Sequence, residues 1–178
     1  MQDLETLIYE INDFSKSNFG FKVEKSSLKT YSPYNWELFC KKNGFNLVSE
    51  GIYIPNILRS YIKENTDYFV LNIFHELFGH GLFCEHSLFG KKLCTLDFKE
   101  AEQYLYKKSN SGISEYFIED YEGIAMLFEE KISIFTNTIE LFNKKLKHFP
   151  NYNSIFEKFK NFEKEYSLKE IFVKFEFL

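Results

Sequence analysis

Residues 67–88 constrain the fold of this chain more than any other stretch of it. Apolar side chains recur there at the spacing of a helix that is largely buried, and they are Leu71, Phe74, Phe78, Leu82 and Phe83. The same stretch carries three of the four histidines together with two glutamates, in the order His75, Glu76, His80, Glu85 and His86. Burying such polar groups is costly unless each finds a partner. The rest of the fold, or a bound metal ion, must therefore supply partners to this helix.

The spacing of its first two histidines, His-Glu-x-x-x-His, is one residue longer than the His-Glu-x-x-His helix of many zinc peptidases. Residues five apart on a regular α-helix point about 140° apart, whereas residues four apart differ by about 40°. A straight helix therefore cannot direct His75 and His80 at one ion. One π-bulge restores the shorter relation, and Gly79, which has no side chain, eases that distortion. We predict such a bulge between the two histidines.

The letters HELFGH resemble the His-Glu-x-x-Gly-His motif of the dipeptidyl peptidase III family of zinc peptidases, and His75, Glu76, Gly79 and His80 all match it. The resemblance implies that both histidines bind zinc, that Glu76 is the general base, and that a glutamate from a later helix is the third ligand. The longer glutamate motif of that family, E-E-C-R-A-E, is absent, and its enzymes are far larger. We therefore carry over a metal-site architecture and not the release of dipeptides.

A later stretch offers that glutamate. Residues 119–130 read EDYEGIAMLFEE, which is similar to the E-G-x-A-x-x-x-E helix of gluzincin peptidases. In that class the first glutamate, here Glu122, is the third zinc ligand, and small residues after it, here Gly123 and Ala125, allow close packing against the motif helix. The resemblance thus gives His75, His80 and Glu122 as ligands of one zinc ion (Zn2+) per chain. Glu85 and Glu129 are candidates to hydrogen-bond a ligand imidazole.

Two imidazoles and one carboxylate leave a fourth zinc position open for water, which is typical of a catalytic site. Glu76 would take the proton of the water and pass it to the leaving amine of a cleaved peptide bond. Peptidases of this type usually add a tyrosine or histidine that stabilises the oxyanion, and the candidates are His86, Tyr116 and Tyr121. His86 lies roughly 16 Å along the helix from His75, so we do not expect it to bind the same ion. The sequence predicts a zinc-dependent peptidase.

Three alternatives stay open. Cys84 lies on the same helix face as His80, so a closed, structural cysteine–histidine zinc site that uses Cys84, with or without Cys94, is one of them. Another is a non-catalytic helical zinc-binding or peptide-binding protein on a metallopeptidase-like scaffold. In the third, no metal binds and the polar residues are hydrogen-bond partners within the core. The small size of the chain favours a non-catalytic protein, whereas the presence of Glu76 favours catalysis.

The remaining patterns predict a mostly α-helical α+β fold with a small sheet in its first third, and the resemblance adds a zincin-like arrangement. Residues 1–178 are expected to form a single gluzincin-like metallopeptidase domain. Further helices are expected over 3–17, 33–42, 97–108, 114–147, 152–165 and 168–176, with a helical turn or two over 56–64. A short strand is expected over 19–23, and a hairpin or pair of strands over 45–55. Residues 51–55 are the candidate edge strand for pairing with a peptide substrate.

Composition restricts the class of partner. The net charge is −4, and lysines interleave with glutamates, so no basic surface for nucleic acid is expected. No apolar run reaches the roughly 18 residues that span a membrane, and the acidic, amphipathic N-terminus differs from a signal peptide. Three cysteines, Cys40, Cys84 and Cys94, cannot all pair, so a cytoplasmic protein without a disulfide framework is expected. The expected partner is a peptide or protein substrate, and the oligomeric state is left open.

Overall fold

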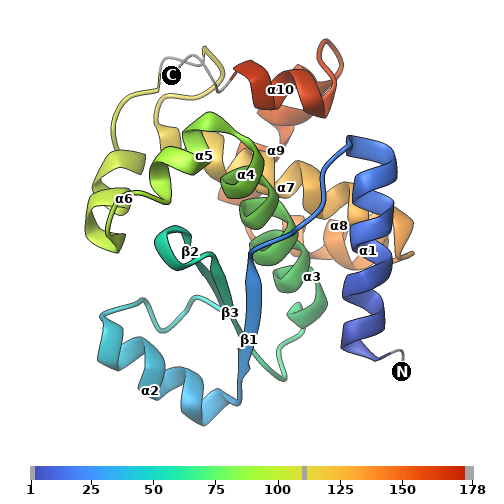
Figure 1. Cartoon of the computed structure of the whole chain (residues 1–178). Helices are drawn as coiled ribbons and strands as arrows, with labels where there is room; N and C mark the ends of the chain where they lie inside the picture. Colours follow the sequence, from blue (N-terminus) through green and yellow to red (C-terminus); the bar gives the residue numbers. More distant parts are fainter. Residues whose placement is uncertain (1–2, 110–111, 175–178) are drawn as a thin grey trace.

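The helix that carries the histidines runs through the centre of the protein (Figure 1), whose computed structural model describes residues 3–109 and 112–174. It consists of α3 (Phe69–Ile73), the π-helical segment η2 (Phe74–His80) and α4 (Gly81–His86), which continue one another directly. Both predictions for this stretch are confirmed: a long, largely buried helix and a π-helical distortion between the two histidines. The helix is shorter than the stretch 67–88 in which it was expected, because it begins at Phe69 and ends at His86. The helix stops at Ser87, whose side chain caps the next helix, α5 (Leu88–Leu93).

Three short strands form one sheet beside the central helix. They are β1 (Ser27–Tyr31), β2 (Gly51–Ile54) and β3 (Arg59–Lys63), in the order β1-β3-β2. The central strand β3 is parallel to β1 and antiparallel to β2, so β2 is an edge strand. The predicted small sheet in the first third of the chain is confirmed.

The prediction was wrong about which residues build two of these strands. Residues 19–23 are not a strand, because Phe19 still belongs to α1 (Leu4–Phe19) and the N–H of Val23 is bound by the Asn12 side chain. Residues 56–64, predicted to be helical, hold the end of a single 3-10 turn, η1 (Pro55–Ile57), and then β3. Of the stretch 45–55, only β2 is a strand. The consecutive residues 60–62 of β3 are buried, so the strand lacks the polar–apolar alternation that identifies a half-exposed strand.

The other predicted helices are largely confirmed. They are α1, α2 (Pro33–Asn43), α6 (Phe98–Leu105), α9 (Pro150–Glu163) and α10 (Leu168–Lys174). A capping box of Asp97 and Glu100 opens α6. The single helix predicted over 114–147 is wrong, because it is two helices, α7 (Phe117–Phe135) and α8 (Ile139–His148). Asn137 lies between them in the left-handed region, with φ 58°, which no helix continues through. The stretch between the helices expected over 97–108 and 114–147 falls partly outside the described residues.

The main hydrophobic core lies where α7 crosses the central helix (Figure 1), and α9 packs on the other side of α7. Ile124, Ala125, Leu127 and Phe128 of α7 are fully buried. A smaller cluster of Trp36, Cys40 and Tyr61 packs α2 against the sheet. The sheet contacts the central helix through β2 and β3, and α6 contacts α7. The cleft described below lies among these elements.

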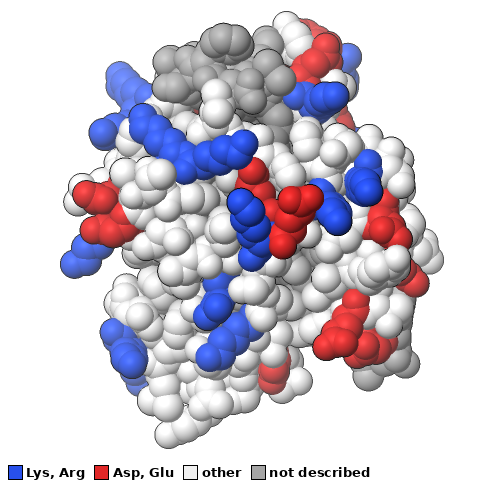
Figure 2. Space-filling view, viewed as in Figure 1, with Lys and Arg blue, Asp and Glu red and all other residues white. Residues whose placement is uncertain are grey.

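The surface gives two further observations. On the face drawn in Figure 2, lysine and arginine side chains are interspersed with aspartate and glutamate. Within the described part of the chain, no helix combines the length and the apolar character needed to cross a membrane.

Candidate metal centre

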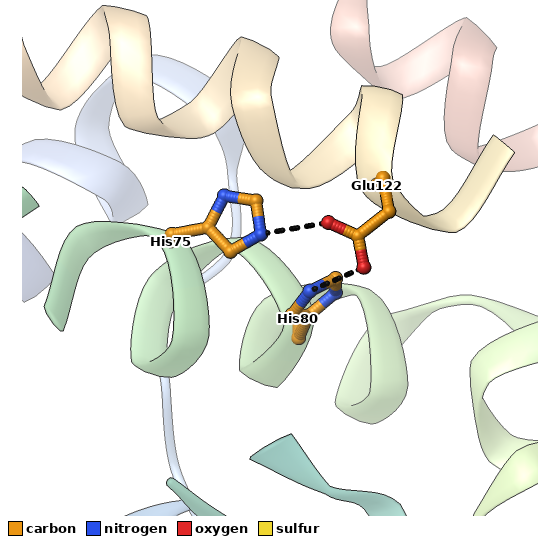
Figure 3. Close-up of side chains that lie close together, drawn as sticks. All are labelled: His75, His80 and Glu122. Atoms are coloured by element: carbon orange, nitrogen blue, oxygen red, sulfur yellow. Dashed lines mark hydrogen bonds and ion pairs between the residues drawn. The ribbon is translucent and has the colours of Figure 1, made fainter. Parts of the chain in front are cut away.

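The structure brings the three predicted ligands together where η2 meets α7 (Figure 3). The Nε2 atom of His75 lies 3.1 Å from one carboxylate oxygen of Glu122, and the Nε2 atom of His80 lies 3.6 Å from the other. One ligand atom from each residue falls within 4.8 Å of the other two, and both histidines are buried. Among the residues that the structure describes, this is the one group of three or more such side chains that can hold a metal ion.

The π-helical segment is what allows this convergence. It adds one residue to the turn between the histidines, so that His75 and His80 face the same neighbour although they are five residues apart. Their ring centroids are 4.7 Å apart and their planes are nearly perpendicular, at 88°. The two imidazoles therefore approach the Glu122 carboxylate from different directions, as ligands of one ion must.

Close packing of the two helices brings Glu122 within reach. A Cβ atom on Gly79 would lie 2.7 Å from both Cα and Cβ of Ala125, a distance that real side chains do not adopt. Gly79 and Ala125 thus set the separation of η2 and α7, which agrees with the packing predicted for Ala125. Gly123 was expected to do the same, and that expectation is wrong. A Cβ there would meet the ring of Phe159, so Gly123 allows α9, rather than η2, to pack closely against α7.

Gly79→Ala is expected to destabilise the protein by about 1–3 kcal/mol, since the added methyl group overpacks a helix contact that cannot widen without moving the core. This loss should exceed the gain of about 1 kcal/mol that alanine brings to a helix. Gly81→Ala is the matched control two residues along, because its Cβ would meet the Ser26 side chain at 3.3 Å and the Glu76 carbonyl oxygen at an ordinary 3.8 Å. Urea unfolding of the two variants and the wild type measures the difference. Equal stability of both variants would contradict this account of the packing.

His75 is held by a second carboxylate, as was predicted for Glu129. The Nδ1 of His75 lies 2.9 Å from Glu129, which in turn accepts a hydrogen bond of 2.7 Å from the Nζ of Lys145. Donation from Nδ1–H to Glu129 fixes the ring so that Nε2, which faces Glu122, is the nitrogen that binds a metal ion in place of its proton. Lys145 was not predicted. Its position between Phe142 and Leu146, on the apolar face of α8, was the available signal of a buried lysine.

His80 is supported differently. Its ring stacks on Tyr121, with centroids 3.9 Å apart and planes at 16°. Its Nδ1 is buried and has no hydrogen-bond partner in the described parts of the chain. Packing on Tyr121, rather than an outer carboxylate, therefore orients this imidazole.

Other predicted participants lie elsewhere. Glu85 was a candidate to hydrogen-bond an imidazole, and that expectation is wrong. It accepts hydrogen bonds of 2.6–3.0 Å from the backbone N–H groups of residues 24–26 instead. His86 donates to the carbonyl of Lys22 (2.8 Å) and is not at the metal centre, in agreement with the prediction from helix length. These two side chains fasten the segment before β1 to the central helix. Tyr116, at the start of α7, does not line the cleft.

The electrostatic field at the centre favours a positive charge between the carboxylates. Burial lowers the pKa of His75. The hydrogen bonds to Glu122 and Glu129 and the negative charges of these two residues outweigh that effect and raise the pKa to about 10. Burial raises the pKa of Glu122, and the two histidines together with Tyr152 outweigh that effect and hold it at about 2. Burial lowers the pKa of His80 to about 3. Glu122 is therefore ionised and His80 neutral, the states in which a carboxylate and an imidazole bind metals.

The candidate centre opens into a cleft of about 560 Å3. Its walls come from β2 and the residues before it, from α6, and from the junction of α8 and α9. Glu76 lines this cleft beside Gly51, at which a Cβ atom would lie 2.8 Å from the Glu76 side chain. Burial raises the pKa of Glu76 to about 7. Tyr152 of α9 also lines the cleft and donates to Glu122 (3.3 Å), although no sequence motif had indicated it.

The cysteine alternative receives no support. Cys84 and Cys94 belong to no group of metal-ligand atoms within the described chain.

Comparisons of the chain with protein-family models, with curated proteins and with solved structures find no match. The functional argument therefore rests on the residues of this centre and of its cleft.

Proposed function

We propose that this protein is a zinc-dependent peptidase with a gluzincin-type, zincin-like active site. One observation carries the proposal: the three clustered ligands and the Glu76 carboxylate open on the same cleft, and the edge strand β2 forms part of its wall. A purely structural site would not require an acidic side chain beside the ligands or access from a cleft.

The donor set suits zinc. Zinc accepts imidazole nitrogen and carboxylate oxygen, and catalytic zinc sites have three protein ligands. His75, His80 and Glu122 supply this set, and the Glu129–His75 hydrogen bond supplies the outer support that such ligands usually have. When bound, a zinc ion acts as a Lewis acid that activates water and polarises the carbonyl group of a peptide.

Glu76 is the proposed general base. It follows His75 in sequence, lies in the cleft, and has no hydrogen-bond or salt-bridge partner among the described residues, so its carboxylate is available to a proton donor. It would accept a proton from the attacking water and deliver it to the leaving nitrogen of the peptide bond.

Tyr152 is the residue best placed to stabilise the oxyanion. Its hydroxyl lies in the cleft, 3.3 Å from Glu122. The predicted candidate Tyr121 also lines the cleft, but its hydroxyl lies 3.9 Å from the Cys84 sulfur and its ring stacks on His80. A phenol that donates to the developing negative charge lowers the barrier of acyl transfer.

The edge strand offers a way to hold an extended peptide. Residues 51–53 of β2 line the cleft, and β2 pairs with β3 on one side only within the described sheet. Main-chain hydrogen bonds between β2 and a peptide would place its backbone across the cleft without selecting a sequence.

The cleft walls predict a preference for basic and apolar substrates. Glu50 and Glu102 line it, whereas Lys145, the one lysine among its described lining residues, is already paired with Glu129. Glu50→Gln is expected to lower kcat/KM for lysine-containing peptides, relative to leucine-containing ones, by about 2- to 10-fold, the scale of a partly exposed ion pair. The exposed Glu10→Gln variant on α1 is the control. An unchanged ratio in Glu50→Gln would refute this selectivity.

The proposed activity is tested by incubating the zinc-loaded protein with a defined mixture of peptides and identifying the products by mass spectrometry. We expect new termini that disappear with a zinc chelator and return when zinc is restored. Binding of zinc and peptides without any cleavage would favour the alternative, a non-catalytic zinc-binding or peptide-binding protein on this scaffold.

A further inference from the structure

Cys84 and Cys94 meet where α5 folds back across α4. A Cβ atom on Gly90 would lie 2.5 Å from the Cα of Cys84, so the approach of the two helices depends on glycine there. Cys94 follows Gly90 by four residues and donates its N–H to the Gly90 carbonyl (3.1 Å), which places both on the same face of the helical turn. The Sγ of Cys94 accordingly lies 3.9 Å from the carbonyl oxygen of Cys84, to which its thiol donates.

The two thiols have unequal surroundings. Cys84 is 1% exposed, whereas Cys94 is partly exposed at the end of α5. The hydrogen bond from Cys84 lowers the pKa of Cys94, while burial raises the pKa of Cys84. The accessible thiol is therefore the one that more readily forms the thiolate, which is the form that reacts with oxidants. Cys40, the remaining cysteine, is buried against Trp36 and Tyr61 in the separate cluster under the sheet.

We propose that Cys84 and Cys94 form a redox-active pair that a peroxide converts into a disulfide. The Cys94 thiolate attacks one oxygen of hydrogen peroxide, the O–O bond breaks, and a sulfenic acid and hydroxide form. The Cys84 sulfur then attacks the Cys94 sulfur, and the S–O bond breaks. The departing hydroxide takes up the Cys84 proton as water. Two thiols and one peroxide thus give one disulfide and two water molecules, and a dithiol reductant reverses the change.

The pair lies one side chain away from the candidate metal centre. The Cys84 sulfur contacts the Tyr121 hydroxyl (3.9 Å), and the Tyr121 ring stacks on His80. A disulfide draws this sulfur toward Cys94 and removes a partner from the tyrosine that orients His80. We therefore expect the oxidised protein to bind zinc more weakly, by up to about tenfold, the lower end of the loss from removing an outer support of a ligand.

The test treats the protein, without added metal, with a small excess of hydrogen peroxide and then with an alkylating agent under denaturing conditions. Peptide mapping should find Cys84 linked to Cys94, with the mass of two hydrogen atoms lost, and Cys40 alkylated. The link should be absent in Cys94→Ser and retained in Cys40→Ser. Alkylation of Cys84 and Cys94 in the treated wild type, or over-oxidation of Cys94 without a link, would overturn the proposal. The wild-type map decides even if a variant fails to fold.

The effect on the metal centre is measured by titrating the reduced and the oxidised protein with zinc alone. This second readout rests on the proposed function, whereas the peptide map does not. A reduced protein that binds no zinc would refute the zinc peptidase and leave the disulfide result standing. Equal zinc affinity of both forms would refute the link between the cysteine pair and His80.

Discussion

Glu76→Gln is expected to lower the rate of peptide hydrolysis by about 10²- to 10⁴-fold, the usual contribution of a general base, while the protein still binds about one zinc ion per chain. The amide keeps the shape of the side chain beside Gly51 but cannot accept the proton of the attacking water. Because Glu76 is not one of the clustered ligands, the loss should appear in kcat rather than in zinc affinity. The measurement is the steady-state rate on a peptide identified in the cleavage screen, with zinc content determined on the same sample.

Glu102→Gln is the matched control, since this glutamate lines the same cleft from α6 but does not adjoin a ligand. It should retain kcat. Full activity of Glu76→Gln would refute the assigned base, and a comparable loss in Glu102→Gln would show that the cleft charge, rather than one carboxylate, controls the rate.

His80→Ala is expected to weaken zinc binding by more than about 100-fold, which exceeds the loss typical of removing an outer support. His80 supplies one of the three ligand groups, and no other described histidine, cysteine, aspartate or glutamate joins the cluster to replace it. The affinity is measured by competition with a chromophoric chelator at constant pH.

His86→Ala provides the control on the same helix, because His86 donates to Lys22 and lies outside the centre. It should bind zinc like the wild type. Glu129→Gln should give an intermediate result, a loss of about 10- to 100-fold, because it disturbs the hydrogen bond that orients His75 without removing a ligand. Similar affinities for the His80 and His86 variants would contradict the assigned ligand set.

Local patterns in the sequence were sufficient to predict the three residues that cluster at the candidate centre and the helices that carry them. The angular argument for His75 and His80 predicted the π-helical segment, because two residues five apart can face one ion only if the helix between them contains one extra residue. The E-G-x-A pattern indicated Glu122, and the structure brings it beside both histidines. The capping box at Asp97 likewise depends on residues close in sequence.

Features that depend on contacts between distant segments were not predictable in this way. The strand β3 is central and has three consecutive buried residues, so it shows no alternation, and β1 acquires its pairing only from β3. Tyr152 and Lys145 join the centre from α9 and α8, more than 20 residues after Glu122, and no motif connects them to it. The packing partner of Gly123 is Phe159 of α9. A small residue allows close packing of any helix beside it, so the sequence alone does not say which helix that is.

The central claim is that His75, His80 and Glu122 hold one zinc ion, and zinc X-ray absorption on the purified protein, combined with its zinc content, tests it most directly. We expect about one zinc per chain, with nitrogen and oxygen neighbours at about 2.0–2.2 Å and no sulfur neighbour. Absence of stoichiometric zinc after incubation with the metal would contradict the claim and leave a hydrogen-bonded core without a metal. A sulfur neighbour at about 2.3 Å would contradict it in favour of a cysteine site.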